Sequence, residues 1–181
     1  MNKDNWRPAA LGLTVLGALA RLAPHPPNFA PVGATSLFAG ARLRGWQAYL
    51  VPLALMAITD PIKSAFYGVP AFSRFQLFAY TSFLITVWLG RFLRNTESIS
   101  RIAAITVLSS IQFYLITNFG SWLWFRDYPH TAAGLASCYI AAVPFFGWTL
   151  ASDLVYTAVL FGLYAWLSRT VATRERVPAA A

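Results

Sequence analysis

Long apolar runs, separated by short clusters of charged residues, dominate the pattern along the chain. A helix that crosses the ~30 Å hydrocarbon core of a bilayer needs about 20 predominantly apolar residues. The runs predict six membrane-spanning helices, at about residues 6–23, 30–43, 45–65, 74–93, 100–122 and 147–168. The second run is the shortest, and residues 169–181 are expected to form a cytoplasmic tail. We therefore predict an all-α integral membrane protein with one domain over residues 1–181.

The composition agrees with this pattern. The chain is 57% hydrophobic and only 11% charged, against roughly 25% charged residues in an ordinary soluble domain. Its net charge of +8 comes from 14 Lys and Arg residues that lie between the apolar runs and do not gather on one polar face. Charges placed in this way flank membrane spans, so we expect a lipid bilayer and no nucleic acid as partner.

The basic residues also predict the orientation of the spans. With six spans and a cytoplasmic N-terminus, ten of the Lys and Arg residues lie inside and four outside, as the positive-inside rule requires. Without the second span the later segments change sides, which leaves five basic residues inside against nine outside. We therefore expect both termini to be cytoplasmic, in a multi-pass protein of the inner (cytoplasmic) membrane. No small-residue cleavage site follows the first apolar run, so we expect a retained span.

The connections on the two sides of the membrane differ in composition. The cytoplasmic ones are short and basic, whereas the outer ones are long and rich in proline and aromatic residues, including the stretch between about residues 123 and 146. The segment PHPPNFAPVGA, residues 24–34, has four prolines among the eight residues from Pro24 to Pro31. Proline fixes φ and lacks a backbone donor, so we expect a stiff, extended strip. Since binding residues concentrate on loops held by a rigid scaffold, the strip is predicted to be a wall on the outer side, with a plain turn between helices as the alternative. The wall would face either a ligand or a protein neighbour.

Two acidic residues, Asp60 and Asp153, lie inside predicted spans. Ionisable groups in a membrane are costly and are functional by default. Each has a structural alternative. Asp60 precedes Pro61 and would then end its helix in an Asp-Pro turn, while Asp153 would bond to a hydroxyl or amide of a neighbouring helix.

The sequence contains none of the common motifs of catalytic and metal sites. His25, His130 and the single cysteine, Cys138, do not have the spacing of metal ligands, and there is no phosphate-binding glycine loop or nucleophile motif. We expect no enzyme, catalytic residue, metal or cofactor, although Cys138 or a histidine stays open as an axial ligand to a metal held in an organic cofactor. Aromatic residues, 16% of the chain, fit interfacial belts and, in the outer loops, the walls of a small-molecule site.

The segments PHPPNFAPVGA (24–34) and TLASDLVYTAVLFGLY (149–164), together with the length and the six-span topology, resemble the substrate-binding S-components of energy-coupling-factor vitamin transporters and a related family of small bacterial membrane proteins. The resemblance implies an S-component-like bundle with a ligand pocket on the outer side, formed by the loops after spans one, three and five. The residues that it places near the ligand are Asn28, Phe29, Asp60, Tyr67, Asn118, Trp122 and His130, with Asp153 as a deeper contact or a tie between helices.

A strip of small residues lies along the first predicted span, where Ala10, Thr14 and Ala18 recur every four positions. Such strips let another helix approach closely, and the alternative is packing within this chain. The resemblance implies contact with a transmembrane coupling subunit that is driven by ATPases. The S-components usually have alanines at this spacing, so Thr14 departs from their pattern.

These features lead to one expected function and two alternatives. We expect a membrane-embedded protein that binds a vitamin-like molecule, such as a corrinoid, a flavin or thiamin, for uptake without covalent chemistry. The first alternative is a structural or accessory subunit of a larger membrane complex, whose aromatic outer loops dock on other subunits. The weaker one is an enzyme that acts on a lipid-like substrate.

Overall fold

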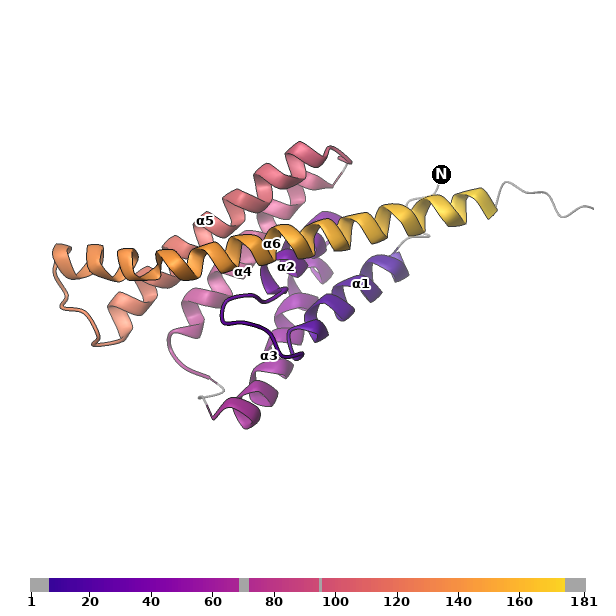
Figure 1. Cartoon of the computed structure of the whole chain (residues 1–181). Helices are drawn as coiled ribbons and strands as arrows, with labels where there is room; N and C mark the ends of the chain where they lie inside the picture. The colour runs from indigo at the N-terminus through magenta and orange to yellow at the C-terminus, as the bar shows by residue number, and fades with distance from the viewer. Residues whose placement is uncertain (1–6, 69–71, 95, 175–181) are drawn as a thin grey trace, which may run out of the picture.

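The computed structural model describes residues 7–68, 72–94 and 96–174. Within these residues the secondary structure is helical, without a strand, which confirms the all-α prediction. The elements, shown in Figure 1, are α1 (Arg7–Ala20), α2 (Val32–Arg42), α3 (Gln47–Tyr67), α4 (Gln76–Gly90), the short 3-10 helix η2 (Arg91–Leu93), α5 (Ile99–Trp124) and α6 (Ala132–Arg174).

Helix α2 lies at the centre of the bundle and packs against α1, α3, α4 and α6 (Figure 1). Nine of its 11 residues are buried. Its contact with α4 is close because two glycines meet there. A Cβ atom on Gly40 would collide with the Val87 carbonyl, and one on Gly90 with the Leu37 carbonyl. At 1.5 Å per residue α2 is only about 16 Å long, roughly half the thickness of a bilayer core.

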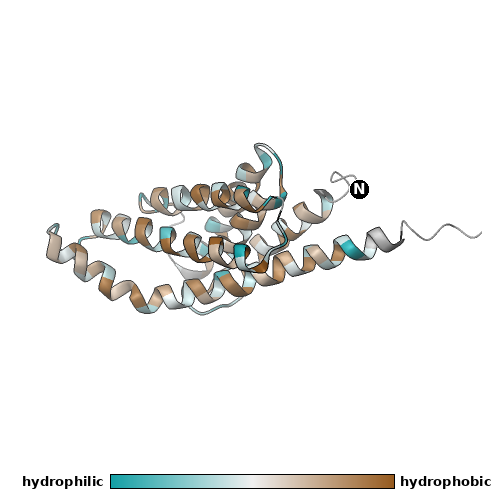
Figure 2. Cartoon of the chain, turned by 90° about the horizontal axis from the view of Figure 1, so that it is seen from above, coloured by the Kyte–Doolittle hydropathy of each residue, from teal (hydrophilic) through white to brown (hydrophobic). Residues whose placement is uncertain are grey.

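Helix α6 begins earlier than the sequence pattern indicated. Residues 132–146, which we expected in an outer loop, are helical, so that prediction is wrong. The reason is an alanine-rich start and a pair of bonds to α5. The Tyr114 hydroxyl donates to the Tyr139 carbonyl at 2.6 Å, and the Tyr139 hydroxyl donates to the Leu115 carbonyl at 2.7 Å. Pro144 lies inside the helix, and Figure 2 shows that α6 bends in its N-terminal part.

Two helices are long and apolar enough to cross a membrane, judged by length and composition: Ile99–Trp124 and Ala132–Thr170. A shorter apolar helix covers Pro8–Ala20. Two of the six predicted spans therefore correspond to helices that are long and apolar enough to cross a membrane. The crossing of all six stays a prediction.

Polar side chains fill much of the interior, and large apolar side chains cover much of the outside. Buried hydroxyl groups include those of Thr14, Thr86 and Ser110, whereas Leu16 and Trp166 are more than 60% exposed. Figure 2 shows hydrophobic residues along nearly every helix. An exterior of this kind is suited to a surrounding that is itself apolar.

Candidate functional site

A cavity of about 170 Å³ lies at the N-terminal end of α2. It is formed by the segment between α1 and α2 and by helices α2, α4, α5 and α6. Phe83 and Phe113 form an aromatic wall, with ring centroids 5.1 Å apart. The polar side chains that line the cavity are those of Arg21, Asn28, Thr86, Ser109, Thr149 and Asp153.

Asp153 binds the N-terminal end of α2 from helix α6. Its carboxylate accepts hydrogen bonds from the Ser110 hydroxyl, at 2.7 Å, and from the Ala34 backbone N–H. It lies so close to Gly33 that a Cβ atom there would collide with it. Pro31, at the cap position, provides no side-chain hydrogen bond to the helix. Asp153 therefore supplies from another helix the negative group that a helix N-terminus favours.

Arg21 links the cavity to a second buried carboxylate, that of Asp60. The Arg21 guanidinium lies 2.8 Å from Asp60 Oδ1 and also donates to Thr59 Oγ1 at 2.9 Å. The Tyr80 hydroxyl and the Gln76 amide donate to Asp60 Oδ2 at 2.6 and 3.0 Å. Asp60 is 8% exposed. The cation that faces the cavity is therefore held in place by a hydrogen-bonded network of α3 and α4 side chains.

The alternative interpretation of Asp60, an Asp-Pro turn that ends the helix, is wrong. Helix α3 continues through Pro61 and ends at Tyr67, where Gly68 has a left-handed backbone with φ 66°. Pro61 cannot donate a backbone hydrogen bond within α3. The bonds of the neighbouring Asp60 carboxylate hold this part of α3 against Arg21 and α4. The αL glycine is an ordinary helix end.

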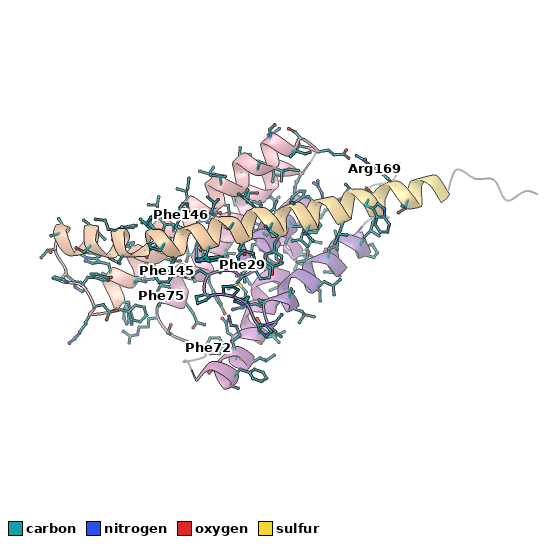
Figure 3. All side chains as sticks on the ribbon, viewed as in Figure 1. Phe29, Phe72, Phe75, Phe145, Phe146 and Arg169 are labelled. Carbon is teal, nitrogen blue, oxygen red and sulfur yellow. The ribbon has the colours of Figure 1, made fainter. Side chains whose placement is uncertain are left out.

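The strip from Pro24 to Pro31 connects α1 to α2 and lies in front of the bundle in Figure 1. It is fastened to α6: Ser152 Oγ donates to the Ala30 carbonyl at 2.9 Å, and the Phe29 ring lies 5.8 Å from that of Tyr156. Phe29 points toward the ribbon of α6 in Figure 3. Asn28 has φ 61°, a left-handed conformation that asparagine tolerates better than most residues. The strip is thus a shaped part of the cavity wall.

Three predicted site residues, Asn118, Trp122 and His130, lie at the far end of α5 and do not line this cavity. Asn118 donates to the Tyr114 carbonyl of its own helix at 2.8 Å. Trp122 packs on the His130 ring, 5.1 Å between centroids, and donates to the Pro129 carbonyl. Tyr67 ends α3, and its side chain lies outside the described part of the structure.

The small-residue strip of α1 faces the interior. Ala10, Thr14 and Ala18 are 1%, 0% and 5% exposed, so the chain's own helices occupy that face. The alternative of packing within this chain is what the structure has. The exposed face of α1 instead carries large apolar side chains, among them Leu11, Leu16 and Leu19.

The sequence analysis missed several residues of the network around the cavity. No pattern in the sequence singles out Gln76 or Tyr80. The signal for Arg21 is weak: an arginine that directly follows an apolar helix and precedes a proline-rich strip. Ser110 donates to the Thr106 carbonyl of its own helix and to Asp153 of α6.

No curated protein and no solved structure matches the chain. A family model does match, over residues 2–178, and its description is a family of unknown function, DUF6580. Because the match covers nearly the whole chain, the protein belongs to the DUF6580 family.

Proposed function

We propose that the protein is a multi-pass membrane protein that binds a small molecule in the cavity at the N-terminal end of α2, for uptake from the outer side. All six helices would lie in the inner membrane, with both termini cytoplasmic. The support for this topology is the charge distribution of the sequence and the exterior of large apolar side chains. The support for uptake of a vitamin-like molecule is the resemblance to S-components.

The observation that carries the binding proposal is the convergence of unlike polar groups on one cavity. A guanidinium (Arg21), an amide (Asn28) and a carboxylate (Asp153) reach the same cavity, beside the aromatic wall of Phe83 and Phe113. Binding sites for small molecules usually combine an apolar or aromatic lining with a few polar groups in fixed positions. The ligand would be a planar molecule with both hydrogen-bond donors and acceptors.

The size of the cavity restricts the ligand further. Sites for drug-sized ligands usually have about 300–1,000 Å³, whereas this cavity has about 170 Å³. A thiamin-, flavin- or corrinoid-sized molecule would therefore enter only if the strip from Pro24 to Pro31 moved away. The strip is the natural element to move, because Asn28 and Ala30 line the cavity and one side-chain bond, from Ser152, ties the strip to α6.

Two asparagines offer a matched test of the proposal. Asn28→Ala removes an amide from the cavity lining, whereas Asn118→Ala removes one that bonds within its own helix. The purified protein would be incubated with a panel of thiamin, riboflavin and cobalamin, and retained ligand would be measured by native mass spectrometry. We expect Asn28→Ala to weaken binding about tenfold and Asn118→Ala to leave it unchanged. The reverse result would move the site to the Trp122–His130 end.

An accessory subunit is the second candidate, and one observation favours it. The N-terminal part of α6 packs on the end of α5 (Figure 1), and it also carries Ile140 and Phe145, which are 71% and 51% exposed. Exposed apolar patches often mark protein contacts. If native mass spectrometry shows a chain without small molecule but tightly bound to other subunits of a membrane complex, the accessory function replaces the binding proposal.

A further inference from the structure

A second and larger cavity lies at the opposite end of α2. It has a volume of about 950 Å³ and is bounded by the C-terminal end of α2, by η2 and the residues after it, by the start of α5 and by the second half of α6. In Figure 1 the start of α5 and the second half of α6 diverge from each other at this end. The cavity therefore opens along the wedge between two apolar helices.

The lining of this cavity is strongly basic. Among the described lining residues, one is acidic, Glu97, and the basic ones are Arg42, Arg44, Arg91, Arg94 and Arg169. Arg169 and Glu97 approach to 3.9 Å, but both side chains are at least 80% exposed, so their attraction is weakened by water. The cavity thus keeps a net positive charge, which attracts an anion.

Arg42 holds the cavity together. Its guanidinium donates to the Leu93 carbonyl at 2.9 Å and to the Thr96 carbonyl at 3.2 Å. It also lies over the rings of Phe161 and Tyr164, 4.9 and 5.2 Å from their centroids. Arg42 therefore joins α2, the segment after η2 and α6. Both of its Nη atoms donate to carbonyl groups, whereas its buried Nε has no partner among the described residues.

Arg94 has a donor that no group of the described residues accepts. Its Nη2 atom is buried and has no hydrogen-bond partner within the described ranges, and the residue lines the cavity. A buried polar group without a partner is costly, and more so when it is charged. The planar guanidinium fork matches the geometry of carboxylate and phosphate oxygens. An anion in the cavity would satisfy the Arg94 donor.

We infer that this basic cavity binds the phosphate group of an anionic ligand, with Arg94 as its principal donor. The apolar lining side chains Leu43, Ile102 and Phe161 lie beside the arginines. This combination suits an amphiphile, and an anionic phospholipid would place its headgroup against the arginines and its acyl chain along the wedge between α5 and α6. Basic pockets between helices bind phospholipid headgroups in this manner. The site does not depend on the small-molecule cavity at the other end of α2.

The test compares lipid and soluble sources of phosphate on the full chain purified in detergent. Binding of phosphatidylglycerol and of phosphatidylcholine would be measured by native mass spectrometry, and binding of inorganic pyrophosphate by calorimetry. We expect phosphatidylglycerol to bind about tenfold more tightly than phosphatidylcholine, since only the former carries a net negative charge. Stronger binding of pyrophosphate than of phosphatidylglycerol would keep the phosphate site and assign it to a soluble ligand.

Three variants connect binding to the cavity. Arg94→Gln should weaken binding of the preferred phosphate ligand about tenfold, and Arg126→Gln, an exposed arginine in the loop between α5 and α6, should leave it unchanged. Arg44 is exposed at the rim of the cavity, and Arg44→Gln should weaken binding of the same ligand about threefold. If Arg94→Gln does not fold, the Arg44→Gln variant tests the site in its place. The inference is overturned if neither phosphate source binds, if phosphatidylcholine binds as well as phosphatidylglycerol while pyrophosphate does not bind, or if the folded cavity variants bind like Arg126→Gln.

Discussion

The two ends of α2 differ in the charged group that they contact and in the size of the cavity beside them. At its N-terminal end the carboxylate of Asp153 accepts from the Ala34 backbone, and the cavity there measures about 170 Å³. At its C-terminal end lies the guanidinium of Arg42, beside a cavity of about 950 Å³. Each charge has the sign that complements the helix dipole, negative at the N-terminus and positive at the C-terminus.

The difference between the ends comes from what covers them. The N-terminal end lies beside a proline-rich strip that is bonded to α6 through Ser152. At the C-terminal end, α5 and α6 diverge from each other (Figure 1). A half-length helix at the centre of a bundle thus has two polar environments, one small and mixed in charge, the other large and basic. The predictions below test whether these environments are independent.

The largest expected effect comes from separating α2 from α4. Gly40→Ala places a Cβ atom against the Val87 carbonyl, and because this atom belongs to the backbone it cannot move aside. We expect a loss of about 3 kcal/mol in the free energy of unfolding, measured in detergent by denaturant titration, and disturbance of both cavities.

A second glycine provides the control for this loss. Gly12→Ala on α1 adds a Cβ atom with no other atom within 4 Å, so it should leave stability unchanged or raise it, since alanine is the better helix former. If Gly40→Ala were as stable as Gly12→Ala, the central position of α2 against α4 would be contradicted.

Removal of the carboxylate at the N-terminal end should have the next largest effect. Asp153→Ala leaves the Ser110 hydroxyl and the Ala34 N–H without their acceptor, which should cost about 2 kcal/mol of unfolding free energy. Asp153→Asn should lose less, because the amide oxygen still accepts and the hydroxyl can turn to accept from the amide. Equal losses in the two variants would mean that charge, and not hydrogen bonding, sets the contribution of Asp153.

A smaller and more local effect is expected at the C-terminal end. Arg42→Lys keeps the positive charge, but a single ammonium group cannot reach the Leu93 and Thr96 carbonyls together. We expect a loss of about 1.5 kcal/mol and faster hydrogen–deuterium exchange over residues 91–99. Arg21→Lys, at the other end, should leave the exchange of this segment unchanged. Faster exchange there in both variants would show that the two ends are coupled.

The smallest effect should come from the rim of the basic cavity. Glu97 is 83% exposed, so Glu97→Gln should not measurably change the unfolding midpoint. The substitution removes the negative charge from the described lining of the cavity, and we expect it to raise the affinity for phosphatidylglycerol about twofold. Weaker binding of this lipid in Glu97→Gln would contradict the inferred position of the phosphate group.

The helices could be located from the sequence with good accuracy, except at the start of α6. The alternation of apolar runs and charges places α3, α4 and α5 within a few residues of their observed bounds. The pattern failed at residues 132–146, because Pro144 and a high aromatic content resemble a loop. Alanine propensity outweighs those signals, together with the bonds from the Tyr114 hydroxyl to the Tyr139 carbonyl and from the Tyr139 hydroxyl to the Leu115 carbonyl.

The candidate site was predictable only in part. Asp60 and Asp153 stand out because acidic groups are rare in apolar runs, and Asn28 was placed by the proline-rich strip and the resemblance. Asn28 and Asp153 line the cavity, and Asp60 is bonded to Arg21. Trp122 and His130 were expected near the ligand because they belong to the connection after the fifth predicted span. In the structure they pack on each other at the end of α5. The pairing of Arg21 with Asp60 joins residues 39 positions apart, and no local pattern carries such information.

The sequence by itself determined the helical class, the approximate position of each helix and the stiffness of the proline-rich strip, because periodicity and proline geometry act over neighbouring residues. Only the tertiary structure decided that α2 lies at the centre, that Ala10, Thr14 and Ala18 face inward, and that five arginines gather at one cavity. Those outcomes depend on which helices pack together. Packing is settled by the close contacts of glycines and by buried hydrogen bonds between distant segments, which residue order does not display.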